Sequence, residues 1–142
     1  MKSELDALLC ERYPLIFADR NRSIQESCMG WGIACGDGWF DLIDTLCNCL
    51  QKSTDSNGAP QVVAVQVKEK FGVLRFYMRP GASEYQRGII GMAEAMSAHL
   101  CEQCGKPGQV VVAGAHMARC LEHAPEMAKE LNWKSLIEDG RA

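Results

Sequence analysis

Apolar side chains recur at helical spacing in three stretches of the chain, and each stretch predicts an amphipathic helix. Ser3 is expected to cap the first helix, over residues 3–12, and Asp37 the second, over residues 37–52. A third helix follows Ser83, which begins the capping-box pattern Ser-Glu-Tyr-Gln. The predicted buried faces are Leu5, Leu8 and Leu9 in the first helix, Trp39, Leu42, Ile43, Leu46 and Leu50 in the second, and Tyr85, Ile89, Met92, Ala93, Met96 and Leu100 in the third.

Two runs rich in β-branched and aromatic residues predict a β-hairpin between the second and third helices. The runs cover residues 62–67 and 73–78, and the link between them contains Phe71 and Gly72, where a turn is expected. A short link that contains glycine favours antiparallel pairing of the two strands.

Four potential metal ligands lie in two pairs in the last third of the chain. Cys101 and Cys104 form a C-x2-C pair, and Cys120 and His123 form a C-x2-H pair. Two intervening residues let the chain fold back as a knuckle, so that both side chains of a pair reach one ion. Thiolate and imidazole are the ligands that Zn²⁺ prefers in a tetrahedron, so the pattern predicts one structural zinc ion.

Other interpretations of these residues stay open. His116 could take the fourth ligand position, and the C-x2-C pair could be a redox pair, although no βαβ pattern surrounds it. Cys28 and Cys35 could contribute to a second metal site. Four protein ligands leave no coordination position for water, so we expect no catalysis at the ion. Its expected role is to hold a subdomain whose own core is too small.

The order of these elements predicts an α+β fold, in which helices pack a small hairpin. Residues 1–100 are expected to form this body. Residues 101–142 are expected to form a zinc-knuckle subdomain of zinc-ribbon or treble-clef type, with a C-terminal helix. Near the end of the chain, Trp133, Leu136 and Ile137 are expected to pack back on the body.

The composition is that of a soluble globular protein, with 47% hydrophobic and 23% charged residues. A net charge of -3 argues against broad binding to phosphate backbones, which needs a basic surface. The first residues carry acidic side chains and no long apolar run, so no signal peptide is expected. No stretch reaches the roughly 18 apolar residues of a membrane span. We therefore expect a reducing cytoplasm in which the cysteines stay as thiols.

Two features are candidates for binding a partner. Trp31 and Trp39 lie in a glycine-rich loop, and tryptophan is a frequent anchor of protein interfaces. The alternative is a structural loop whose tryptophans pack on the core. Lys68, Lys70 and Arg75 give the predicted hairpin a basic side, and aromatic neighbours make a stacking platform for nucleic acid conceivable. The alternative there is a half-buried sheet with solvated cations.

Three further segments are distinctive, namely ERYP at residues 11–14, CGDGWFDLID at residues 35–44 and VKEKFGVLRFY at residues 67–77. Together with the two ligand pairs, they resemble a family of small phage and prophage proteins of bacteria, over most of residues 11–124. The resemblance implies a bacterial cytoplasm and a phage accessory role, and it carries over no catalytic residues.

We therefore expect a phage-derived, zinc-stabilised binding module and not an enzyme. Its expected partner is a protein or another host or phage macromolecule, such as a component of a host defence system that it inhibits. One alternative is a zinc-ribbon protein that binds nucleic acid. A second is a treble-clef, nuclease-like enzyme with a histidine such as His116 as base, although the sequence contains no recognisable nuclease motif. No membrane association is expected, and the sequence leaves the oligomeric state open.

Overall fold

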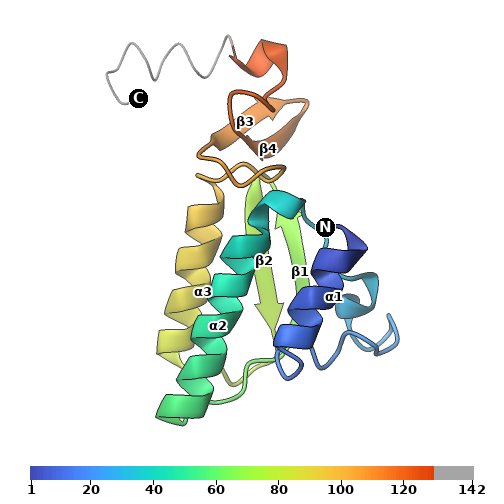
Figure 1. Cartoon of the computed structure of the whole chain (residues 1–142), viewed down its shortest axis with the longest axis vertical. Helices are drawn as coiled ribbons and strands as arrows, with labels where there is room; N and C mark the ends of the chain where they lie inside the picture. Colours follow the sequence, from blue (N-terminus) through green and yellow to red (C-terminus); the bar gives the residue numbers. More distant parts are fainter. Residues whose placement is uncertain (130–142) are drawn as a thin grey trace.

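The computed structural model describes residues 1–129 and has an α+β architecture with two small antiparallel sheets, which confirms the predicted fold class. Figure 1 shows α2 and α3 side by side, with the β1–β2 hairpin between α2 and α1 in this view and the β3–β4 hairpin above. The helices are α1 (Ser3–Arg12), α2 (Phe40–Asn57) and α3 (Glu84–Ser97), with the 3₁₀ helices η1 (Cys28–Trp31) and η2 (Asp37–Trp39), and the strands are β1 (Ala64–Lys70), β2 (Val73–Met78), β3 (Gln109–Ala113) and β4 (Ala115–Arg119).

The first helix covers the predicted residues but is capped differently. α1 ends before Pro14, because the residue that precedes a proline disfavours the α conformation. Its N-cap residue is Lys2, and no side chain caps it, so the predicted Ser3 cap is wrong. Leu9 is fully buried, and Asp6 is buried on the same helix.

The second helix begins and ends later than the sequence predicts. Asp37 does not cap α2; it lies in η2 and accepts a hydrogen bond from the backbone N–H of Lys2 at 2.8 Å. α2 continues to Asn57, where Gly58 adopts a left-handed conformation with φ 66° and closes the last turn. The buried face agrees with the prediction at Trp39, Ile43, Leu46 and Leu50.

The predicted hairpin forms, and its turn explains the sequence at its tip. Phe71 and Gly72 both have positive φ, 56° and 77°, as a two-residue type I′ turn requires. Glycine adopts this conformation without strain, whereas Phe71 adopts it with its side chain 67% exposed. β1 begins at Ala64, two residues later than predicted.

Both edges of the β1–β2 hairpin are covered. On the β1 side, Ala34 forms an isolated parallel bridge with the strand. On the β2 side, α3 supplies acceptors: the N–H of Leu74 donates to Ser97 Oγ at 2.8 Å, and the N–H of Phe76 donates to the Glu94 carboxylate at 2.8 Å. Covered edges limit pairing with other chains.

The third helix has the predicted capping box, but only part of its predicted face is buried: Ala93 is buried as expected, and Ile89 and Leu100 are half-buried. Ser83 and Gln86 exchange the two side-chain hydrogen bonds of the box. Tyr85, Met92 and Met96, which the pattern predicts to be buried, are 66%, 59% and 47% exposed. The prediction is wrong for these three residues, because the helix turns toward β2 a neighbouring face on which Ser97 and Glu94 accept hydrogen bonds from the strand. The buried residues are Gln86, Ile90, Ala93 and Ser97.

The described chain closes with a helical turn at residues 126–129. The predicted packing of Trp133, Leu136 and Ile137 on the body lies outside the described residues. Within residues 1–129, no helix combines the length and the apolar character that crossing a membrane requires.

Candidate metal centre

The two predicted ligand pairs come together in the structure. The ligand atoms of Cys101, Cys104, Cys120 and His123 all lie within 4.8 Å of one another. Cys101 and Cys120 are buried, whereas Cys104 is exposed. All eight cysteines of the chain are free thiols, so no disulfide joins the pair Cys101 and Cys104. The cluster of three thiols and one imidazole can hold one metal ion.

Three of the distances within the cluster are close to those around a tetrahedral ion. The Sγ atoms of Cys104 and Cys120 are 3.7 Å apart, and His123 Nδ1 lies 3.6 Å from Cys101 Sγ and 3.3 Å from Cys120 Sγ. An ion with metal–sulfur bonds of about 2.3 Å and metal–nitrogen bonds of about 2.0 Å separates its ligand atoms by roughly 3.5–3.8 Å. The side chains are therefore spaced to share one ion, with His123 contributing Nδ1.

The first pair is shaped by a tight turn of the backbone. Gly105 has φ 74°, which favours glycine, and its N–H donates to the carbonyl of Cys101 at 2.8 Å. Burial alone would raise the pKa of the Cys101 thiol, but backbone N–H groups of Cys120, Cys104 and Gln103 lower this pKa to about 6. The same donors favour a thiolate, which is the form that binds metal.

The second pair follows the β3–β4 hairpin. In the turn after β4, the N–H groups of His123 and Ala124 donate to the carbonyl of Cys120 at 3.1 and 2.9 Å. This turn brings the two side chains of the pair to the same side. Val111 and Ala118, on facing strands, are fully buried and form the small apolar centre of the hairpin.

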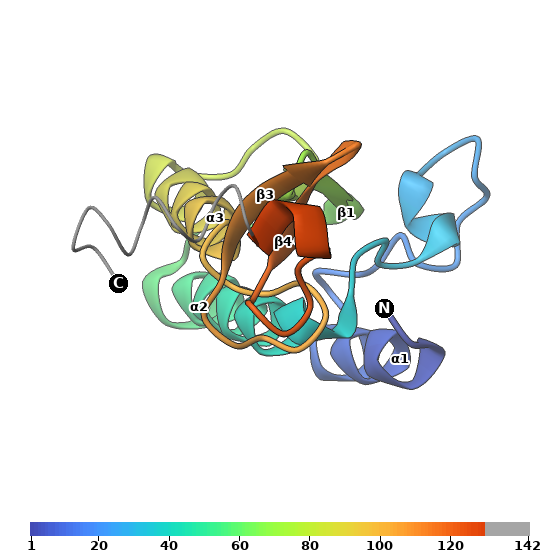
Figure 2. The same ribbon diagram turned by 90° about the horizontal axis from the view of Figure 1, so that it is seen from above.

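The metal unit, defined here as residues 101–124, is joined to the body through the glycine-rich loop. The N–H of Gly36 donates to the Glu102 carboxylate at 2.8 Å, and the N–H of Gly38 donates to the Glu102 carbonyl at 2.8 Å. The indole Nε1 of Trp39 donates to the carbonyl of Leu100 at 3.0 Å. Figures 1 and 2 show the unit lying across the ends of α2 and the β1–β2 hairpin.

His116, the rival fourth ligand, lies elsewhere. Its ring is exposed and meets Phe71 edge-on, with the ring centroids 6.0 Å apart. The tips of the two hairpins therefore touch, and His116 belongs to this contact and not to the metal cluster. A cavity of about 420 Å³ beside it is lined by Glu69, Lys70, Phe71, Gly114, Ala115 and His116.

The two tryptophans of the glycine-rich loop have opposite environments. Trp31 is 73% exposed, so its ring is available to a partner. Trp39 is 0% exposed and packs in the core beneath the metal unit, so it does not contribute to a surface. Its prediction as a partner-binding residue is corrected on this ground, because a buried ring has no face left for another molecule.

The three predicted basic residues lie on the outward face of the β1–β2 hairpin. Lys68 and Arg75 are opposite each other in the register. The ammonium of Lys68 lies 5.8 Å from the ring centroid of Tyr77, and that of Lys70 lies 5.5 Å from the centroid of Phe71. Arg75 pairs with a carboxylate of α3, at 3.3 Å, so its charge is already compensated. Lys68 and Lys70 form no salt bridge within residues 1–129.

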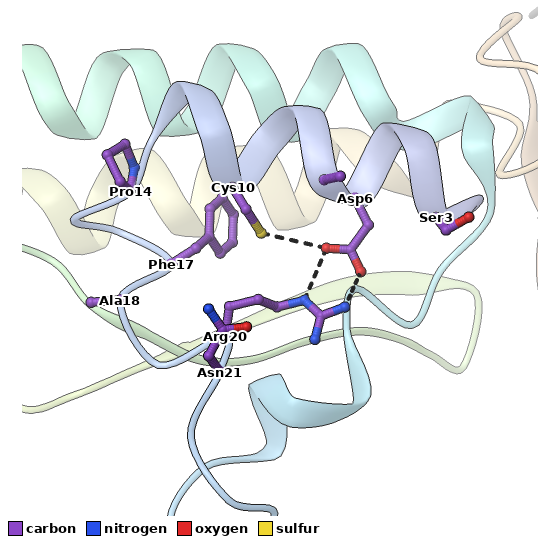
Figure 3. Close-up of a pocket in the computed structure, with 9 residues that line it drawn as sticks. Ser3, Asp6, Cys10, Pro14, Phe17, Ala18, Arg20 and Asn21 are labelled. Atoms are coloured by element: carbon purple, nitrogen blue, oxygen red, sulfur yellow. Dashed lines mark hydrogen bonds and ion pairs between the residues drawn. The ribbon is translucent and has the colours of Figure 1, made fainter.

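A second polar cluster lines a surface pocket of about 460 Å³ beside α1, which Figure 3 shows. Arg20 donates from Nε and Nη2 to the two carboxylate oxygens of Asp6, at 3.2 and 3.0 Å. Cys10 Sγ lies 3.5 Å from Asp6, and burial followed by the charge of Asp6 raises the pKa of this thiol to about 11. Arg20 also donates to the carbonyl of Gly30 at 3.3 Å. Arg20 therefore links α1 to the loop that contains Gly30, and the charges of Arg20 and Asp6 compensate each other.

This cluster was not predicted from the sequence. Asp6 and Arg20 are separated by a helix end and a turn, and neither belongs to a short motif. The only sequence signal is an acidic residue placed among the leucines of the first helix, beside Leu5.

A scan of protein-family models finds no match to this chain, and searches of curated proteins and of solved structures find none either. The assignment of a function therefore depends on the geometry described above.

Proposed function

We propose that this protein is a zinc-stabilised binding module that contacts a host or phage macromolecule. The observation that carries the proposal is the cluster of Cys101, Cys104, Cys120 and His123, whose ligand atoms lie within 4.8 Å. A phage accessory role, such as inhibition of a host defence system in the bacterial cytoplasm, follows from the sequence resemblance.

Zinc is the metal that this ligand set fits best. Three thiolates and one imidazole in a tetrahedron are typical of structural zinc sites, and softer thiolate ligands disfavour magnesium and calcium. A knuckle, a hairpin and a second pair of ligands before a helical turn also form the chain order of a treble clef. This supports assigning the metal unit to a treble-clef-like or zinc-ribbon-like class.

A closed ligand set supports binding and not catalysis. Four protein side chains fill a tetrahedral zinc ion, so no position remains for a water or a substrate. The three cysteines of the set approach the ion from two separate arms of the chain, and the ion therefore cross-links them. We infer that the metal holds the unit in its folded form, as structural zinc does in small domains.

The surface proposed for the partner combines an exposed ring with unpaired charge. Trp31 is 73% exposed, and tryptophan provides a large, rigid contact area in protein interfaces. Lys68 and Lys70, on the outward face of the hairpin, would favour a partner with acidic side chains. We therefore expect the partner to be a protein with an acidic surface.

The proposal can be tested by cross-linking the full-length, zinc-loaded protein in lysate from phage-infected bacteria. A partner that the wild type captures should be lost with Trp31→Ala and with Lys68→Glu. The matched control is Arg87→Glu, which reverses an exposed charge on α3, and it should capture the partner as the wild type does. Recovery of background proteins only, or equal capture by all variants, would contradict the proposal. Elemental analysis of the same samples should give one zinc per chain.

The second candidate function is binding of single-stranded nucleic acid by the outward face of the hairpin. It is favoured by the juxtaposition of Lys68 with Tyr77 and of Lys70 with Phe71, because bases stack on aromatic rings beside cations. Fluorescence anisotropy with a labelled oligonucleotide at low salt measures it directly. Binding that weakens with Tyr77→Ala would support this function, and the absence of binding at micromolar protein would remove it.

The nuclease-like alternative has less support. His116 is the histidine proposed as base, and its ring contacts Phe71 at the tip of the hairpin. Glu69, which lines the same cavity, uses its carboxylate to accept the N–H of Gly72 at 2.5 Å. No second acidic side chain lines this cavity among the described residues, so a metal-dependent nuclease site is not assembled there.

A further inference from the structure

A largely apolar groove runs between α2 and α3, on the side of the helices that faces away from the core. It encloses about 250 Å³. Its lining residues from α3 and the following turn are Ile89, Met92, Ala93, Met96 and Leu100, and those from α2 are Asp41, Leu42, Thr45, Leu46 and Cys49. A smaller pocket that also contains Cys49 continues the groove toward Tyr85, at the other end of the helix pair.

Unlike an ordinary surface helix, α3 exposes large apolar side chains while it buries two polar ones. Its buried face includes Gln86 and Ser97, both fully buried, whereas Met92 and Met96 are 59% and 47% exposed. Tyr85, about two turns before Met92 on the same stripe, is 66% exposed. A contiguous exposed apolar stripe of this kind marks an interaction surface. Methionine suits such a surface because its flexible side chain adapts to a partner.

The α2 side of the groove carries one charge of each sign at its two ends. Asp41 lies in the first turn of α2, and Lys52 lies eleven residues later on the same face of the helix. Neither forms a salt bridge with another residue of the described chain. Arg12 is close enough to Asp41 to interact electrostatically, but its salt bridge goes to Asp44, at 2.9 Å.

These features identify the occupant of the groove. α2 and α3 are antiparallel neighbours, as the colours in Figure 1 show. If two such helix pairs face each other about a twofold axis perpendicular to the helices, the Asp41 end of one copy meets the Lys52 end of the other. The dimer then contains two symmetry-related pairs of Asp41 and Lys52, and the methionines of the two copies meet near the axis. We propose that the α2–α3 groove binds a second copy of this chain, which forms an antiparallel four-helix interface.

The first test is the mass of the full-length, zinc-loaded protein by sedimentation equilibrium. At about 50 μM the protein should have twice the 15.7 kDa mass of one chain. Met92→Glu, which places a charge in the apolar stripe, should weaken the dimer at least about tenfold. Ala95→Glu adds the same charge on an exposed position of α3 that does not line the groove, and it should leave the dissociation constant unchanged. A wild-type monomer, or a dimer that Met92→Glu does not weaken, overturns the proposal.

The second test exchanges the two charges and needs no change in the apolar stripe. Asp41→Lys and Lys52→Asp should each weaken the dimer by about tenfold, because each places like charges opposite each other twice. The double variant restores opposite charges and should recover the wild-type dissociation constant to within about threefold. A double variant as weak as either single one overturns the antiparallel arrangement. Circular dichroism and zinc content, measured on every variant, show that the fold is intact.

This inference does not depend on the proposed function. Capture of a foreign partner through Trp31 and the hairpin can fail while the dimer forms, and the charge exchange separates the two results.

Discussion

Replacing Gly38 by alanine tests how closely the metal unit is fitted to the body. A Cβ atom at this position would lie 2.3 Å from the carbonyl oxygen of Cys101, and 2.4 and 2.5 Å from the amide nitrogens of Gly105 and Cys104. All three contacts are with backbone atoms, so no side-chain rotation can relieve them. The φ of Gly38 is outside the positive region, so the substitution tests space and not backbone strain.

The size of the effect follows from the contacts that must move. To accept the methyl group, the knuckle has to move away from η2 by roughly 1 Å. Overpacking of this kind lowers the free energy of unfolding by about 1–3 kcal/mol. The shift also stretches the hydrogen bonds from Gly38 N–H to Glu102, at 2.8 Å, and from Trp39 Nε1 to Leu100, at 3.0 Å. Each contributes about 1 kcal/mol. Gly38→Ala should therefore lower the free energy of unfolding by about 2–4 kcal/mol.

Urea denaturation of the zinc-loaded protein measures this change. The matched control is Gly91→Ala, in the middle of α3, where an added Cβ has nothing within 4 Å. Because alanine favours a helix over glycine, that variant should be more stable than the wild type by about 0.5–1 kcal/mol. Equal stability of Gly38→Ala and the wild type would refute the close fit of knuckle and loop.

Three further substitutions test the metal, a strand edge and a helix end. Cys104→Ser should abolish zinc binding in elemental analysis and reduce amide protection in the metal unit, whereas Cys49→Ser, at an exposed thiol outside the cluster, should keep the metal. Ser97→Ala should lower the unfolding free energy by about 1–3 kcal/mol in urea denaturation, because the buried N–H of Leu74 loses its acceptor. Gly58→Ala should cost about 1–2 kcal/mol in the same assay, because alanine is strained at φ 66°.

The elements that the sequence predicts well are those whose determinants are close together in the chain. The capping box that begins at Ser83 places donor and acceptor three residues apart, and it forms as expected. The turn at Phe71 and Gly72 is likewise specified by two residues and the strands beside them. The metal ligands belong to the same class, since each pair is separated by two residues and only the meeting of the pairs is non-local.

The predictions that fail are those that needed knowledge of the neighbouring element. Spacing identifies an apolar stripe on α3 through Met92 and Met96, but it cannot say which face meets β2. The strand edge selects Ser97 and Glu94, because its N–H groups need acceptors. Asp37 fails as a cap for a similar reason: the N-terminal segment supplies Lys2 as its partner.

The glycine-rich loop combines a correct and an incorrect prediction, and the structure explains why it is rich in glycine. Gly36 and Gly38 have no side chain because the backbone of the metal unit lies against them, with Cβ positions 2.2 and 2.3 Å from carbonyl oxygens. Trp39, the next residue, fills the core below and binds the carbonyl that precedes Cys101. A loop whose composition favours a partner-binding site is thus largely occupied by the chain itself. The large apolar side chain of the loop that remains exposed to another molecule is Trp31. Because the loop leads directly into α2, loss of the metal should loosen the first turn of this helix along with the knuckle, while the buried middle of α2 keeps its packing.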